Sequence, residues 1–189
     1  SLIKTKGEEN NASTVVFAPH WHKGVIGIVA SRLIDEHYRP TLVFTKANEG
    51  ILAASARSVR DFNVYNAIDS CSAHIIQFGG HKYAAGVTIR EKKYSAFKAA
   101  FEKVVDETIT SSQKEKVIDI DLKLSFAEIT PKLMRLIKQM EPFGPENKRP
   151  VFYTEGVSIT GHAKLVGPAK DHLKANFVHG NGGPISAIG

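Results

Sequence analysis

The sequence predicts a mixed α/β domain followed by a small β-rich domain. Before residue 110, short apolar stretches that suit strands alternate with longer stretches of helical periodicity. The polar stretch Thr110–Glu115, which contains no apolar side chain, then marks a boundary. Beyond it, short strand-like segments surround a single helical segment, which is typical of a small barrel. We therefore predict two domains, 1–110 and 111–189.

The first domain begins with a short buried strand at Thr14–Ala18. A turn at 21–24 leads into a helix that runs to about Tyr38 and is ended by Pro40. Small residues in this helix permit close packing against a sheet. These small residues are Gly24, Gly27 and Ala30. The apolar stripe consists of Val25, Ile26, Val29, Leu33 and Ile34.

Two strands, Thr41–Phe44 and Ile51–Ser55, follow on either side of a turn-rich segment. A short helix fits Val64–Cys71, and Gly86–Ile89 returns as a strand after a glycine-rich segment. The last helix of this domain runs from about Lys92 to Thr108, because its aromatic and valine residues recur on one helical face. Together these elements predict a mixed sheet flanked by helices.

In the second domain, alternating apolar and acidic residues predict a strand at Val117–Leu122 with one wet face. A helix follows, with Leu133, Leu136, Ile137 and Met140 pointing inward. The candidate strands are 151–153, 156–160, 173–178 and 185–188. A barrel of this size needs about five strands to close. Because the sequence stops directly after the last candidate strand, we expect the barrel to be incomplete at its carboxyl end.

Composition limits the class of protein only moderately. The formal net charge of +6 suits a polyanionic partner such as nucleic acid. The single cysteine, Cys71, excludes an internal disulfide and fits a reducing compartment. No apolar run approaches the roughly 20 residues that span a bilayer, and no signal peptide is recognisable. We therefore expect a cytoplasmic protein without a membrane partner.

The segment Phe78–Gly86 reads FGGHKYAAG and is the clearest candidate for a phosphate site. Gly79 and Gly80 can adopt turn conformations in which their amides point at one oxyanion, and His81 and Lys82 add donors. The small residues at 84–86 let a nucleotide approach closely. The alternative is a purely structural tight turn that leads into a buried strand.

Ser55 and Arg57 stand two apart in a predicted strand, so both side chains emerge from one face. Arginine offers a planar fork of donors, and serine adds a hydroxyl, so the two could hold one phosphate together. Ser58 lies next to them, and Arg60 is a weaker candidate. The alternative is a solvated arginine at a strand end.

Two histidine and aspartate patterns suggest metal sites, but we predict none. His20 and His22 flank Trp21, and no carboxylate or cysteine nearby completes a recognisable ligand set. Asp119 and Asp121 are better explained by the wet face of a strand.

The second domain interleaves cations with aromatic residues, a mixture that suits single-stranded nucleic acid. Lys164 and Lys174 could follow a phosphate backbone, and Phe177 could stack on a base. The alternative is that the aromatic side chains fill a barrel core while the lysines are merely solvated.

The segment Phe78–Gly86 resembles the GGHxxAAG signature of the DHH-associated domain, the substrate-binding half of the DHH phosphoesterases. Four further blocks, in the same order, resemble the RecJ family of bacterial single-strand-specific exonucleases within that superfamily. These blocks are Trp21–Leu33, Arg39–Thr41, Ser55–Ser58 and Glu141–Gly144. The resemblance covers most of the chain from about Trp21 onward.

This resemblance implies that the second domain is an oligonucleotide-binding (OB) barrel. It also implies that Ser55, Arg57 and the Gly79–His81 turn hold the terminal phosphate of single-stranded DNA, and that Trp21 and His22 lie at a seam with a catalytic domain. In the family that domain, which precedes this region, holds two manganese or magnesium ions. A single-strand-binding protein or a helicase is a further suggested partner.

The function that the resemblance implies is metal-dependent degradation of single-stranded DNA from its 5′ end, in repair and recombination. None of the metal-binding motifs of the family is present here, so we expect this chain to bind nucleic acid without cutting it. Two alternatives stay open: a free-standing single-strand-binding module, and part of a phosphodiesterase for short oligonucleotides or cyclic dinucleotides.

Overall fold

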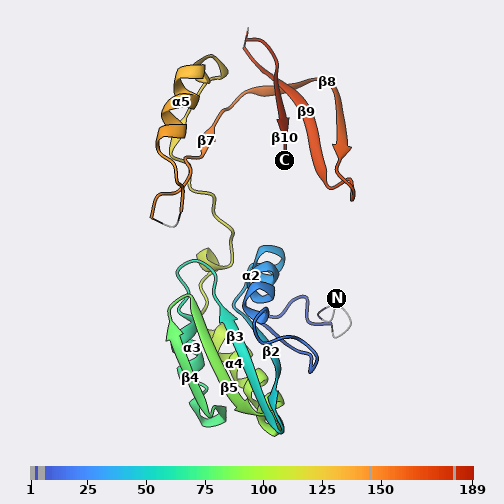
Figure 1. The fold of residues 1–189 in the computed structure, drawn as a ribbon, viewed down its shortest axis with the longest axis vertical. Coiled ribbons are helices and arrows are strands. Elements are labelled where there is room, and N and C mark those ends of the chain that lie inside the picture. Colours follow the sequence, from blue (N-terminus) through green and yellow to red (C-terminus); the bar gives the residue numbers. More distant parts are fainter. Residues whose placement is uncertain (1–2, 4–6, 145, 181) are drawn as a thin grey trace. The chain divides into compact units, whose positions relative to one another are not determined.

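The computed structural model describes residues 3, 7–144, 146–180 and 182–189 (Figure 1). Its contacts divide the chain into two compact units, Ser1–Lys116 and Val117–Gly189. The sequence predicts the division after residue 110, and the stretch between the two positions contains the short 3-10 turn Ser111–Gln113. Within the described part of the chain, no helix has the length and apolar character needed to cross a membrane.

A five-stranded sheet organises the first unit, with the strand order β1-β2-β3-β5-β4. The strands β1 and β2 are parallel, and the other neighbours are antiparallel. The strands are β1 (Thr14–Phe17), β2 (Thr41–Asn48), β3 (Ile51–Arg57), β4 (Gln77–His81) and β5 (Ala84–Arg90). With helices packed against the sheet, the predicted mixed α/β fold is confirmed.

Helices cover the two faces of this sheet unequally. Helix α2 (Ile26–His37) packs on one face, where Ile26 and Ala30 are buried against Val16 and Val43. Helices α3 (Val64–Asp69) and α4 (Tyr94–Thr108) pack on the other face (Figure 1). Side chains alternate along a strand, so each residue of β3 or β5 faces either α2's side or the side of α3 and α4.

The larger core lies between the sheet and α4. Phe44, Phe97 and Phe101 are fully buried there, and the ring centroid of Phe97 lies 5.6 Å from that of Phe44 and 6.0 Å from that of Phe101. Burial of each such ring contributes about 1.5–3 kcal/mol. Cys71 belongs to the same core, and burial raises the pKa of its thiol to about 11. The thiol therefore stays protonated at neutral pH.

A buried arginine fastens the segment before β1 to the sheet. Arg39 donates hydrogen bonds to Thr14 Oγ1 at 2.7 Å and to the carbonyls of Glu8 and Glu9 at 2.9 and 2.8 Å. Burial lowers the pKa of its guanidinium, whereas the charges of Glu102 and Glu8 raise it. Arg39 thus satisfies backbone carbonyls that would otherwise need water.

The glycine pair does not form the turn that the sequence suggested. Gly79 and Gly80 lie within β4, and the hairpin turn is Lys82–Tyr83. Gly80 has φ +148°, and a Cβ there would lie 2.3 Å from the carbonyl oxygen of Ala84. Neither Lys82 nor Tyr83 has a positive φ. The two-residue hairpin turns that best match the twist of the flanking strands require a positive φ in the turn. The unusual backbone angle instead falls on Gly80, inside the strand.

The second unit contains a three-stranded antiparallel sheet of order β10-β9-β8, and a two-stranded parallel pair of β6 and β7. Its elements are β6 (Leu122–Lys123), α5 (Pro131–Gln139), β7 (Phe152–Tyr153), β8 (Val157–Val166), β9 (His172–His179) and β10 (Ile185–Ile188). Its described strands do not close into a barrel.

The strand predicted at Val117–Leu122 is wrong for most of its length. Only Leu122 and Lys123 pair, with Phe152 and Tyr153, because the partner strand is two residues long. Ile118 and Ile120 are 71% and 52% exposed, so the alternating pattern has no buried side. Asp121 accepts a hydrogen bond from the amide of Val151 at 2.8 Å, which is a structural use of this carboxylate.

We predict that Gly80→Ala destabilises the first unit while Gly79→Ala does not. A non-glycine residue at the Gly80 backbone angle costs about 1–3 kcal/mol, to which the overlap with Ala84 adds. In a domain of this size each kcal/mol lowers Tm by about 4–8 °C. Thermal unfolding followed by circular dichroism measures the difference.

Gly79→Ala is the matched control, since a Cβ at Gly79 would meet no atom within 4 Å. Equal Tm values for the two variants would contradict the role given to Gly80.

Candidate nucleic-acid interface

The carboxyl end of β3 carries the serine and the arginine that the sequence paired. Arg57 Nη1 donates hydrogen bonds to Ser55 Oγ at 2.9 Å and to the carbonyl of Ala56 at 2.8 Å. Both side chains are half-buried. The prediction that they share one face is confirmed. A guanidinium and a hydroxyl side by side are donors that suit phosphate oxygens.

Helix α2 contacts this pair through a glycine. A Cβ added at Gly27 would lie 2.8 Å from Arg57 Nη2 and 3.1 Å from Ser55 Oγ. The guanidinium therefore lies where a side chain of α2 would otherwise be. We expected Gly27 only to let the helix pack on the sheet. Its contact with Arg57 joins residues thirty positions apart, and no local pattern in the sequence signals it.

The strands beside Arg57 leave their face almost bare. Arg57 pairs with Ala84 and Ser55 pairs with Gly86. Gly86 in turn pairs with Gly79 of the edge strand β4. Gly79 and Gly86 are both exposed, although β5 is an inner strand. Backbone is therefore open to a ligand here, as the small residues suggested.

Ala85 is an exception among those small residues. It is 6% exposed and belongs to the core on the side of α3 and α4. Because it alternates with Ala84 and Gly86 along β5, it faces away from the open surface. Ala85 therefore cannot line an approach to Arg57.

His81 lies at the end of the edge strand, on the same face as Arg57. The register aligns Arg57, Ala84 and His81 across three strands. His81 Nδ1 accepts a hydrogen bond from the amide of Tyr83 at 3.3 Å. A neutral ring with Nδ1 in this role carries its proton on Nε2, so the exposed side of His81 is a donor.

Among the remaining predicted residues of this region, Ser58 and Arg60 lie in the loop after β3, and Lys82 lies in the β4–β5 hairpin turn. Ser58 Oγ donates to the carbonyl of Phe62 at 2.9 Å. Lys82 Nζ lies 3.4 Å from Asp61 Oδ1, and Arg60 Nε lies 3.7 Å from Asp61 Oδ2. The pKa of Lys82 is raised, first by its hydrogen bond with the Tyr83 side chain and then by Asp61. Asp61 would compete with a phosphate for both cations.

A depression of about 380 Å³ continues the open face away from Arg57. Its floor includes Gly79 and Gly86, and Lys23, Gln77 and Thr88 border it. Lys23 belongs to the turn before α2 and is exposed. No pattern in the sequence indicates that this lysine lies beside the glycine strands.

Trp21 and His22 belong to the same turn. His22 Nδ1 accepts a hydrogen bond from the amide of Gly24 at 3.1 Å, and the carbonyl of Trp21 accepts one from the Thr45 hydroxyl. Their assignment to an interdomain seam stays a prediction. Within the described residues, no group of three or more His, Cys, Asp and Glu side chains could hold a metal ion.

In the second unit, the cations and the aromatic residue lie on opposite faces. Lys164 of β8 pairs directly with Lys174 of β9, and both are exposed. Phe177 pairs with Ile159 and Ile185 and is three positions from Lys174, so it points to the other side of β9. The sheet therefore separates Phe177 from the two lysines.

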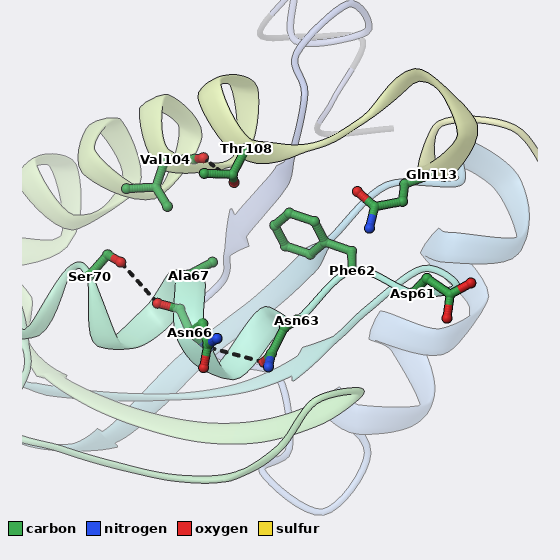
Figure 2. Close-up of a pocket in the computed structure, with 9 residues that line it drawn as sticks. All are labelled: Asp61, Phe62, Asn63, Asn66, Ala67, Ser70, Val104, Thr108 and Gln113. Atoms are coloured by element: carbon green, nitrogen blue, oxygen red, sulfur yellow. Dashed lines mark hydrogen bonds between the residues drawn. The ribbon is translucent and has the colours of Figure 1, made fainter.

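A second hollow, of about 340 Å³, lies on the helical side of the first unit between α3 and α4 (Figure 2). Phe62 and Val104 form apolar walls, and Asn63, Asn66 and Gln113 bring carboxamides (Figure 2). Its described lining contains no lysine or arginine and includes Asp61. The open sheet face is the better candidate for a polyanion.

Known protein families match both units. The DHHA1 domain matches residues 10–107, and the RecJ OB domain matches residues 120–189. The single-stranded-DNA-specific exonuclease RecJ of Bacillus subtilis is 32% identical over 92% of this chain and 22% of its own length. The Haemophilus influenzae protein of the same name is 34% identical over 90% of this chain and 30% of its own length.

This chain thus spans between a fifth and a third of these curated relatives. The crystal structure of RecJ from Thermus thermophilus in complex with Mn2+ has a TM-score of 0.69 and 24% sequence identity, covering 99% of this chain and 31% of that chain. That likeness shows a common fold.

We predict that Gly27→Ala displaces Arg57 without unfolding the domain. The new methyl group meets the flexible end of the arginine, which can move, and alanine in a helix is more favourable than glycine by about 1 kcal/mol. The Arg57 Nε–Hε resonance in a 1H–15N spectrum should therefore shift while Tm stays equal or rises.

Gly24→Ala serves as the control, because its Cβ would meet the His22 ring and not Arg57. An unmoved Arg57 resonance in Gly27→Ala would show that the helix does not hold the guanidinium.

Proposed function

Because the chain belongs to the RecJ family, with a DHHA1 domain and a RecJ OB domain, we propose that it is the substrate-binding, carboxyl-terminal part of a single-stranded-DNA exonuclease. In this proposal the parent enzyme removes nucleotides from the 5′ end. The observation that carries it is the Ser55 and Arg57 pair beside a bare strand face.

The terminal 5′-phosphate binds at the end of β3. Arg57 supplies charge and a planar set of donors, and Ser55 supplies a hydroxyl already within hydrogen-bond distance of the guanidinium. His81, aligned with Arg57 in the sheet register, presents its Nε2 to the same surface. Ser58 and Lys82 contribute less in this proposal, because Ser58 is engaged with Phe62 and Lys82 with Asp61.

The sugar and backbone of the terminal nucleotide lie over Gly86 and Gly79. Any side chain at these two positions would project from the face that Arg57 occupies. Glycine at both positions keeps the ligand close to the sheet, so that a phosphate can reach Arg57 while the nucleotide rests on backbone. This supports a nucleotide ligand over a lone anion.

On the polar face of the second unit, a pair of lysines offers a separate track for a phosphodiester backbone. Lys164 and Lys174 are directly opposed in the sheet, an arrangement that is unfavourable without a counter-charge. A phosphodiester backbone supplies that charge. Phe177 lies on the other face and is not part of this proposed track.

Hydrolysis takes place outside the residues described. Two divalent ions, manganese or magnesium, would supply an activated water and stabilise the leaving oxygen when bound. No described cluster of this chain fits such ions, so we assign none of its residues to the chemical step. In this proposal the chain binds the single strand and does not cut it.

We predict that Arg57→Ala weakens binding of a 5′-phosphorylated single strand by about tenfold more than that of its 5′-hydroxyl counterpart. One charge-assisted hydrogen-bond site is worth about 1.5–3 kcal/mol, and 1.4 kcal/mol is a factor of ten. Fluorescence anisotropy of 3′-labelled oligonucleotides measures both affinities.

Arg90→Ala is the matched control, since Arg90 is exposed at the other end of β5. Equal losses on the two strands in Arg57→Ala would argue against a terminal-phosphate site. The labelled strand is also checked for length with manganese present, and shortening by the purified wild-type chain would refute the assignment of hydrolysis elsewhere.

We further predict that Gly86→Val weakens binding of both strands, whatever their 5′ end, and leaves Tm unchanged or higher. An added Cβ would meet only the Ala54 carbonyl at 4.0 Å, and valine suits a strand, but its branched side chain covers the floor. Anisotropy and thermal unfolding of the same samples test this. Unchanged DNA binding would show that the nucleotide does not lie on β5.

A further inference from the structure

The depression beside the glycine strands is one step further along the sheet than the proposed 5′-phosphate site. In the register of β3 and β5, Arg57 pairs with Ala84, Ser55 pairs with Gly86, and Ala53 pairs with Thr88. We call these three pairs the first, second and third levels. Each step of two residues covers about 6.8 Å along an antiparallel strand, which is about the length of one nucleotide in a single strand. The depression occupies the second and third of these levels.

Among the described residues that border this depression, Lys23 is the cation. Lys23 is exposed and lies on the same face as Gly79 and Gly86. Arg57 lies at the first level of the register and Lys23 beside the second and third, so the two cations serve different positions along a bound strand. Gln77 and Thr88 border the depression with neutral hydrogen-bonding groups.

The turn that carries Lys23 is fixed at several points. His22 Nδ1 accepts a hydrogen bond from the amide of Gly24, and the carbonyl of His22 accepts one from the amide of Val25 at 3.0 Å. The Thr45 hydroxyl of β2 donates to the carbonyl of Trp21. The backbone of Lys23 is thus held beside the sheet before any ligand arrives, and only the side chain has to order on binding.

We propose that Lys23 binds the first internucleotide phosphate of a strand whose 5′-phosphate is held by Arg57. The inference rests on the proposed function and assigns a second phosphate contact, one nucleotide inward, to a residue from the turn before α2. The depression then receives the terminal nucleotide over Gly79 and Gly86, and the second nucleotide beside it toward Gln77 and Thr88.

The test combines protein and DNA changes in one cycle. A 5′-phosphorylated single strand is prepared with a neutral methylphosphonate at the first internucleotide linkage, or at the fifth as a control position. Binding of wild-type chain and of Lys23→Ala is measured by anisotropy at several salt concentrations.

Neutralising the first linkage should weaken wild-type binding by about fivefold, the effect of one exposed charge contact, and should not weaken Lys23→Ala binding. Neutralising the fifth linkage should affect the two proteins equally. With the unmodified strand, Lys23→Ala should also reduce the slope of log affinity against log salt by about 0.7.

Lys46→Ala is the matched lysine control. Lys46 is exposed on β2 and pairs with Leu52, which places it on the opposite face of the same sheet. Neutralising either linkage should weaken binding of Lys46→Ala and of the wild-type chain equally.

The outcomes separate this inference from the function on which it rests. If Arg57→Ala is coupled to the 5′-phosphate but Lys23→Ala is not coupled to the first linkage, the second contact is wrong and the terminal site stands. Coupling of Lys23 to the fifth linkage alone would also overturn the inference. If neither variant shows coupling, the proposed function fails together with it.

Discussion

The alternation of side chains along β3 and β5 is the constraint on which the rest of the first unit depends. Ala54 and Ala56 of β3, and Ala85 and Val87 of β5, are buried on the side of α3 and α4. Their neighbours in sequence must therefore face the opposite side, where Ser55, Arg57 and Gly86 lie. One set of residues builds the aromatic core, and the interleaved set forms the candidate ligand face on the other side of the sheet.

Helix α2 covers part of this face and leaves the rest exposed, and glycine residues lie in both parts. Gly27 lets the helix lie so close that Arg57 occupies the space of a missing side chain. Gly79 and Gly86 keep the neighbouring strands bare. The absence of a Cβ therefore permits close helix packing at Gly27 and leaves the backbone exposed at Gly79 and Gly86. At Gly80 the glycine serves the backbone itself, through its φ of +148°.

Charge is distributed unevenly over this surface. Asp61 lies close to Lys82 and Arg60 in the loop after β3, whereas Arg57 is held by neutral oxygens of Ser55 and Ala56. An arginine held by neutral acceptors keeps its full charge for an incoming anion, while a cation beside a carboxylate must first exchange partners. In the second unit the two lysines of β8 and β9 are direct partners in the register.

The sequence by itself determined the features that depend on residues near one another in the chain. The common face of Ser55 and Arg57 follows from their spacing, and the helices and strands of the first unit follow from their periodicity. The GGHxxAAG signature and its companion blocks indicated the family.

Only the tertiary structure decided features that depend on what packs opposite. The alternating run at Val117–Leu122 has a partner of just two residues, so most of it stays unpaired. The glycine pair lies in β4, where Gly80 has a positive φ that neither turn residue has. Phe177 and Lys174 lie on opposite sides of one sheet, a separation that the residue types by themselves do not indicate. Gly27 and Lys23 come beside the β3 and β5 face only because α2 packs across the sheet, and no spacing within the chain carries that information.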